Sequence, residues 1–355
     1  MLSECEGCGL LVIAEGKVVA DGCAFEHALT HHGIVVAGER SMAQAGSCSL
    51  FRNKQSGAGV YDGGTLELSK CTSNNNQHSG YWVQAGGHMT LIACESDNDR
   101  IGFGASGSSS MLHARHSAVK RSTERGVQVF NQATSELLHC SILESAFSGL
   151  VVVDGANVFA RSCTIKDAKI RHGVEVSGEQ SSAEVKDCYL MGNSEAGAGV
   201  FQAGRLKLES CKAGGNGVAG YWTQSGGHLV LNSCTSSGDQ IGCGARGDGT
   251  QLRMAGGRVM CCAKNGILVD DGANGAIFGV HASLNEDSSF ACAGMGTSMH
   301  VNCCASLDAV PYSVKDGARM ACWDSIPDFD AMTSPEAHTA LWPPIALVGH
   351  SINIA

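Results

Sequence analysis

The sequence predicts an all-β chain folded as a single right-handed parallel β-helix, a solenoid of about 14 coils, because three patterns repeat along it. A glycine followed by an alternating apolar run recurs every 21–26 residues or so, roughly one coil of such a solenoid. Cysteines recur 23 residues apart, and one block of the chain repeats 140 residues later. The right-handed sense follows the general rule for parallel crossover connections.

Apolar and polar residues alternate within each coil, as in "TLELSKC" at Thr65 and "HLVLNSC" at His228. A period of two indicates strands. The chain has no long segment with the 3.6-residue period of a helix, which argues against helical repeats of the ankyrin type. Successive coils of a β-helix pair at about 4.8 Å, so residues in the same frame are expected to stack on one another.

The cysteines provide a second register along the chain. Because stacked side chains point the same way, their Cβ atoms do not converge as a disulfide requires. Metal ligands must surround a point rather than lie along a line. We therefore expect buried free thiols that fill a narrow turn, with no metal and no cofactor. The in-frame series is Cys48, Cys71 and Cys94, then Ser117, Cys140, Cys163, Cys188, Cys211 and Cys234, with Cys23 and Cys303 fitting the same series.

The chain also contains a duplication much longer than a single coil. Residues 33–126 align without a gap on residues 173–266, with roughly four in ten positions identical. The β-helix is predicted to span residues 1–325, after which the pattern decays. Residues 326–355 are predicted to form a C-terminal cap or tail, since the last coil of a solenoid exposes apolar core and unpaired strand edges.

Composition and charge limit the classes of partner. The formal net charge is −10 and the pI is near 5.7, so nucleic acid and anionic membranes are poor electrostatic partners. No apolar run reaches the roughly 20 residues of a membrane span. The first residues lack the basic region of a secretory signal, which predicts an intracellular, cytoplasmic protein with reduced thiols.

Aromatic side chains form the main candidate binding site. In each coil the second residue after the glycine is expected to face outward. Counted from Gly59, Gly80, Gly199 and Gly220, this position makes Tyr61 a neighbour of Trp82, and Phe201 a neighbour of Trp222. Aligned aromatic residues on an outer face are typical of binding surfaces. The alternative is that the tryptophans pack over neighbouring side chains. The predicted binding residues, for a protein partner or a polysaccharide, are Tyr61, Trp82, Gln84, Phe201, Trp222 and Gln224.

The densest polar cluster offers weak catalytic candidates. Arg246 and Asp248 occur in "GARGDG", one coil before Asp270 and Asp271. An arginine could neutralise a sugar acid while an aspartate acts as a base. The alternative is that these residues are solvated charges in turns. No catalytic residue is therefore assigned, and the chain is expected to be a binding protein rather than an enzyme.

The run "GV.V...G.L.L..C....N...G" resembles the parallel β-helix repeat of carbohydrate-binding and sugar-hydrolase domains. The same repeat occurs in the β-helix region of F-box only protein eleven. The resemblance covers about residues 10–325 and implies the fold more than the activity. It suggests a non-catalytic binding or scaffold module, for example for substrate recognition in a ubiquitin-ligase-like complex. The alternatives are a polysaccharide-active lyase, epimerase or hydrolase, and a passive structural spacer.

Overall fold

The computed structural model describes residues 2–3 and 5–323, which contain strands and turns but no helix. The strands form a parallel β-solenoid of about 14 turns, which confirms the predicted fold class. Contacts divide the chain into two compact units, unit 1 (Met1–Ser194) and unit 2 (Glu195–Ala355). The predicted cap or tail, residues 326–355, lies outside the described residues.

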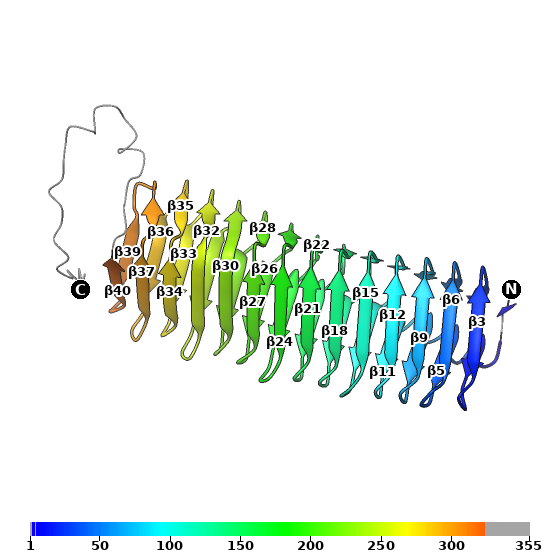
Figure 1. The fold of residues 1–355 in the computed structure, drawn as a ribbon. Helices are drawn as coiled ribbons and strands as arrows, with labels where there is room; N and C mark the ends of the chain where they lie inside the picture. The colour runs from blue at the N-terminus through cyan, green and yellow to red at the C-terminus, as the bar shows by residue number, and fades with distance from the viewer. Residues whose placement is uncertain (1, 4, 324–355) are drawn as a thin grey trace. The chain divides into compact units, whose positions relative to one another are not determined.

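Each coil of unit 1 contributes strands to two parallel sheets, and each strand lies beside its counterpart in the next coil (Figure 1). Sheet B contains β2 (Leu10–Val12), β5 (Ile34–Ala37), β8 (Ala58–Tyr61), β11 (Ser79–Gln84), β14 (Ile101–Ser106), β17 (Arg125–Phe130), β20 (Leu150–Val153) and β23 (Val174–Ser177). The longer strands of sheet A are β3 (Lys17–Asp21), β6 (Met42–Gly46), β9 (Thr65–Ser69), β12 (His88–Ile92), β15 (Met111–Arg115), β18 (Thr134–Leu138), β21 (Asn157–Arg161) and β24 (Ser182–Lys186). Its shorter strands are β1 (Leu2–Ser3), β4 (Ala24–Glu26), β7 (Ser49–Phe51), β10 (Thr72–Asn74), β13 (Glu95–Asp97), β16 (Ala118–Lys120), β19 (Ser141–Leu143), β22 (Thr164–Lys166) and β25 (Tyr189–Met191).

Unit 2 repeats this arrangement, with two longer sheet A strands that each continue through the turn. Its sheet B strands are β26 (Ala196–Phe201), β29 (Ala219–Gln224), β31 (Ile241–Arg246), β33 (Asn265–Asp270), β36 (Ser288–Ala293) and β39 (Tyr312–Lys315). Its sheet A strands are β27 (Arg205–Glu209), β28 (Lys212–Gly214), β30 (His228–Ser237), β32 (Gln251–Met260), β34 (Asn274–Phe278), β35 (His281–Ser283), β37 (Ser298–Asn302), β38 (Ala305–Ser306) and β40 (Arg319–Trp323).

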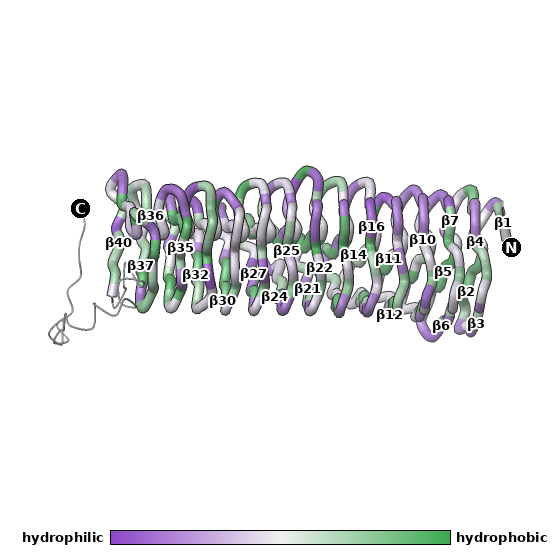
Figure 2. Tube along the Cα trace, turned by 90° about the horizontal axis from the view of Figure 1, so that it is seen from above, coloured by the Kyte–Doolittle hydropathy of each residue, from purple (hydrophilic) through white to green (hydrophobic). Residues whose placement is uncertain are grey.

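The core follows from the alternation in the sequence. In β12, Met89 and Leu91 are buried while His88 and Ile92 are exposed. Hydrophilic residues gather in turns, as beside β10 and β16 in Figure 2. Burial of one face of each strand removes apolar surface from water, which is the main favourable contribution to folding.

Two buried tyrosines show how closely the second copy of the repeat follows the first. The Tyr81 hydroxyl donates to the Cys71 carbonyl at 3.0 Å. The Tyr221 hydroxyl, 140 residues later, donates to the Cys211 carbonyl at the same distance. A buried tyrosine hydroxyl must find such an acceptor, and the stacked cysteine coils provide it in both units.

The repeated glycine is required because the carbonyl of the next coil occupies the space of a side chain. A Cβ built on Gly57 would lie 2.7 Å from the Gly80 carbonyl oxygen, and one on Gly197 would lie 2.7 Å from that of Gly220. The anchor glycines of these coils are therefore Gly57 and Gly197. The outward positions predicted from the sequence are counted from Gly59 and Gly199. Each of these glycines lies two residues after the glycine that packs against the next coil.

The cysteine ladder consists of free thiols, as expected. Cys71 and Cys94 are buried, and each thiol lies 3.4 Å from a backbone carbonyl oxygen of the preceding coil. Burial raises the pKa of the Cys48 thiol to about 11, so it is protonated at neutral pH. Near the end of the series the prediction is wrong in one position, because Cys304 is buried and Cys303 is exposed.

A buried polar ladder runs along one turn of unit 1. Asn76 donates from its backbone and side-chain nitrogens to Asp99 Oδ1 at 2.7 and 2.9 Å. Ser73 and Ser96 donate to Asp99 Oδ2 at 2.9 and 2.7 Å. Burial raises the pKa of Asp99 to about 6, and the four donated hydrogen bonds oppose that rise.

The raised pKa of Asp99 predicts a pH-dependent stability. Because the folded pKa lies above the unfolded value, the favourable contribution is complete below about pH 4 and is lost as the pH rises to about 6. We expect the free energy of unfolding to fall by roughly 2 kcal/mol across that window. Asp99→Asn keeps the shape of the ladder and should flatten the dependence. Urea unfolding from pH 4 to 7 tests this, and equal slopes for the two proteins would contradict it.

The described residues include no helix long and apolar enough to cross a membrane.

Candidate functional site

The register of sheet B corrects the predicted aromatic row. Gly59 lies opposite Trp82, which places Tyr61 opposite Gln84. Gly199 likewise lies opposite Trp222, which places Phe201 opposite Gln224. Tyr61 and Trp82 therefore do not occupy equivalent positions in neighbouring coils, and neither do Phe201 and Trp222. The prediction is wrong because the anchor glycines lie two residues earlier than expected.

Trp82 faces outward but is covered. Its ring lies across Gly104 of the next coil, whose Cβ would be 2.3 Å from Trp82 Cε3. His78 packs edge-on against the ring at 4.6 Å, and Phe130 lies 6.0 Å from it. The indole nitrogen donates to Gln84 Oε1 at 3.1 Å, and the side chain is 6% exposed. In unit 1 the tryptophan therefore takes the packed arrangement that the sequence left as the alternative.

Tyr61 is half-buried and has a structural partner. Its hydroxyl lies 2.9 Å from His32 Nε2, while the Ser56 backbone nitrogen donates to His32 Nδ1 at 3.0 Å. The Nδ1 atom must then be an acceptor, so the proton of the neutral ring sits on Nε2 and is donated to Tyr61. Burial and the nearby histidines lower the pKa of His32 to about 4, which keeps this ring neutral at pH 7.

In unit 2 the same tryptophan is more open. Trp222 lies across Gly244, with a would-be Cβ 2.3 Å from Cζ3, and donates to Gln224 Oε1 at 2.9 Å. Both Trp222 and Gln224 are half-buried. Phe201 is also half-buried at the edge of the row.

The predicted polar cluster comes together beside this tryptophan. Gln224, Arg246 and Asp270 occupy the same register in three successive coils. Arg246 donates from Nε to Asp271 at 2.7 Å and lies 3.8 Å from Asp270. Asp248 is exposed in the same turn region, with its Oδ1 against Gly272.

Asp270 is the unusual member of the cluster. Its Oδ1 atom is buried and has no hydrogen-bond partner among the described residues. Burial raises the pKa of Asp270, Arg246 opposes the rise and Asp271 adds to it. An arginine and two carboxylates with different surroundings can exchange hydrogen bonds with a ligand, but this geometry alone assigns no reaction.

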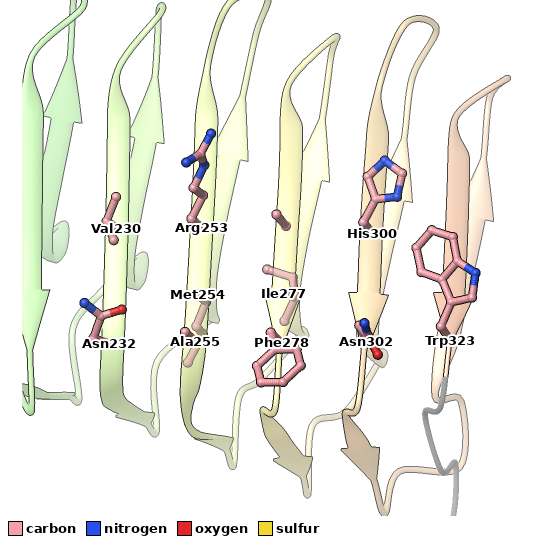
Figure 3. Close-up of a pocket in the computed structure, with 11 residues that line it drawn as sticks. Val230, Asn232, Arg253, Met254, Ala255, Ile277, Phe278, His300, Asn302 and Trp323 are labelled. Atoms are coloured by element: carbon pink, nitrogen blue, oxygen red, sulfur yellow. The ribbon is translucent and has the colours of Figure 1, made fainter.

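Sequence reasoning missed a groove on the outer face of sheet A in unit 2 (Figure 3). It is a hollow of about 380 Å³, within the range of small-ligand sites. Its lining residues are Val230, Asn232, Arg253, Met254, Ala255, Ala276, Ile277, Phe278, His300, Asn302 and Trp323.

Aromatic and polar side chains alternate along this groove. Phe278, Asn302 and Trp323 share one register in successive coils. Phe278 is 54% exposed and Trp323 36%. His300 stacks on Trp323 with ring centroids 5.5 Å apart and planes 2° from parallel, and Figure 3 shows both rings on the open side of the strands.

The described lining of the groove contains an arginine and no carboxylate, although the chain as a whole is acidic. Arg253 is exposed, and its side chain forms no ion pair with any residue that the structure describes. Arg205 and Arg319 are exposed at other outward positions of the same sheet. In unit 1, by contrast, Arg115 pairs with Glu136 at 3.7 Å. An unpaired guanidinium in a hollow is available to an anionic ligand.

The groove could have been suspected from the outward positions of strands such as "QLRMA" at Gln251 and "RMACW" at Arg319. The register between coils was needed to bring these residues together. No group of three or more histidine, cysteine, aspartate or glutamate side chains within the described residues could hold a metal ion.

The chain belongs to the right-handed β-helix family. The family model "Right handed beta helix region" matches residues 2–142 and 126–305. A search of curated protein sequences gives no match.

Two of the similar solved structures show the same fold, and a third has a lower TM-score. The periplasmic alginate epimerase AlgG is 8% identical, with a TM-score of 0.55 over 88% of this chain and 78% of that chain. A double mutant of the same epimerase is 9% identical, with a TM-score of 0.58 over the same shares. The A-module of the Azotobacter vinelandii mannuronan C-5 epimerase AlgE6 is 15% identical, with a TM-score of 0.42 over 86% of this chain and 91% of that chain. At these identities the likeness concerns the fold.

Proposed function

We propose that this protein binds an acidic polysaccharide, and that the groove between Val230 and Trp323 is its binding site. The observation that carries the proposal is an exposed Arg253, with no ion-pair partner among the described residues, in one groove with the exposed rings of Phe278 and Trp323. The β-helix fold that it shares with an alginate epimerase supports a polysaccharide ligand. The ubiquitin-ligase hypothesis gains no support from these comparisons.

The chemistry of the groove matches a polymer of uronic acids. Sugar rings present apolar C–H faces that pack on exposed aromatic side chains. The carboxylate of each uronate can accept two parallel hydrogen bonds from an arginine, which a neutral hydroxyl cannot reproduce. Asn232 and Asn302 line the same groove and can exchange hydrogen bonds with sugar hydroxyls. Repetition of the strands at about 4.8 Å suits a ligand that is itself a repeating chain.

Unit 1 offers an internal contrast. A hollow of about 330 Å³ on its sheet A includes Asp21 and Glu67 in its lining, with no arginine or lysine. Carboxylates at this hollow would repel a uronate polymer, since like charges at an interface cost binding energy. The proposed site is therefore confined to unit 2.

Substitutions in the groove test the proposal. Binding of alginate and polygalacturonate oligomers is measured by calorimetry. Arg253→Gln and Trp323→Ala are each expected to weaken binding about tenfold or more, because each removes a contact worth roughly 1.5 kcal/mol or more. Binding should also weaken with added salt, since the charges are exposed to solvent.

The matched control is Arg115→Gln, an exposed arginine of the same sheet in unit 1. It should bind the oligomers as the unaltered protein does. Failure of the unaltered protein to bind any uronate oligomer would overturn the proposal, as would equal losses in Arg115→Gln and Arg253→Gln.

A further inference from the structure

The two copies of the tryptophan motif share one framework. Trp82 and Trp222 each lie across a glycine of the next coil, with the same 2.3 Å approach to a would-be Cβ. Each indole donates to a glutamine two residues later, at 3.1 and 2.9 Å. Any difference between the two sites must therefore come from the side chains around the ring.

Those surrounding side chains differ in kind. Around Trp82, His78 and Phe130 provide an aromatic cover that leaves the ring 6% exposed. At the matching positions 140 residues later stand Val218, which is 41% exposed, and Asp270. The second copy has a valine and an aspartate in place of its two aromatic covering residues, and Trp222 is half-buried rather than buried.

The other exchanged residues add charge at the same place. Arg246 stands where unit 1 has Ser106, and Asp271 stands where it has Asn131. Arg246 is held by Asp271 at 2.7 Å and lies 3.8 Å from Asp270. The result is a partly open indole that donates to Gln224, with Arg246 and Asp270 in the register of Gln224 in the next two coils and Asp271 hydrogen-bonded to Arg246.

We propose that Trp222, Gln224, Arg246 and Asp270 form a second saccharide site, selective for a neutral sugar unit. The sugar's C–H face packs on the indole, its hydroxyls donate to the carboxylates, and the guanidinium donates to its oxygens. Carboxylates outnumber the arginine here, so a uronate is disfavoured. The selectivity is opposite to that of the groove on sheet A. Both proposed sites bind saccharides, so the second proposal rests in part on the proposed function. The two sites lie on different sheets, however, and an experiment can rule out one proposal without the other.

Variants that restore the residues of unit 1 test this site. Asp270→Phe and Arg246→Ser place in unit 2 the side chains that the same framework accommodates in unit 1. Calorimetry with cellohexaose, mannohexaose and xylohexaose is expected to show that at least one of them binds the unaltered protein. In both variants that binding should weaken at least tenfold.

The same protein samples supply the controls. Alginate oligomer binding and the melting temperature should be unchanged in both variants, which separates loss of this site from misfolding or loss of the groove. Trp82→Phe, in the covered copy, should leave neutral-sugar binding unchanged. The proposal is overturned if none of the three hexasaccharides binds the unaltered protein, or if Asp270→Phe and Arg246→Ser both bind them normally.

Discussion

Replacing Gly220 with alanine is expected to lower the free energy of unfolding by about 3 kcal/mol or more. A Cβ at this position would lie 2.2 Å from Ser236 Oγ, 2.7 Å from Asp239 Oδ2 and 2.7 Å from the Gly242 carbonyl oxygen. The carbonyl belongs to a strand paired on both sides and cannot move without breaking the sheet. The two side chains are themselves hydrogen-bonded to each other at 2.6 Å, so the added methyl group has no space to enter.

The measurement is chemical unfolding of the variant beside Gly7→Ala. Gly7 has no atom within 4 Å of its would-be Cβ, so the same substitution there should change stability by less than about 1 kcal/mol. Similar losses at the two positions would show that the glycine ladder is not a steric requirement. Faster amide hydrogen exchange confined to unit 2 would show that the destabilisation is local to the coils around Gly220.

The second large effect is expected at Asp99. Asp99→Ala removes the acceptor of four hydrogen bonds, from Asn76, Ser73 and Ser96. These donors are buried, so they lose their partner without gaining water. We expect a loss of about 4 kcal/mol at pH 5, where a pKa of about 6 leaves most of the carboxyl group neutral and its favourable contribution largely retained.

Thermal and urea unfolding of Asp99→Ala and Glu67→Ala measure this effect. Glu67 is exposed on β9, so its removal should cost less than about 0.5 kcal/mol. If the two substitutions lowered the free energy of unfolding by similar amounts, the buried polar ladder would contribute no more to stability than an exposed glutamate. Asp99→Asn should fall between Asp99→Ala and the unaltered protein, because it keeps one acceptor oxygen for the Asn76 donors.

Some features of the fold were predictable because they are local and periodic. The alternation in "TLELSKC" defines which residues of β9 enter the core, and the structure buries Leu66 and Leu68 as that pattern indicates. The 23-residue cysteine spacing predicts buried free thiols such as Cys71 and Cys94, which the structure confirms. These properties follow from the side-chain period of a strand and the constant length of a coil.

The environment of the aromatic residues was less predictable. The outward direction of Trp82 follows from strand periodicity, but its burial depends on His78 and Phe130, which belong to the preceding turn and to a strand two coils away. The sequence could not show which neighbours reach across the sheet. The predicted register of Tyr61 was wrong by two residues, because the sequence alone does not distinguish Gly57 from Gly59 as the anchor glycine. The structure identifies Gly57, since the Gly80 carbonyl occupies the space of its side chain.

Taken by itself, the sequence determined the fold class, the strand character of each coil and the polar cluster of Arg246, Asp270 and Asp271, because each depends on spacing along the chain. Only the tertiary structure decided that Trp82 is covered while Trp222 is half-open, and that Arg253, His300 and Trp323 share one groove. The physical reason is that burial and charge pairing depend on side chains from neighbouring coils. Their register is set by backbone pairing and close packing, which no single stretch of sequence contains.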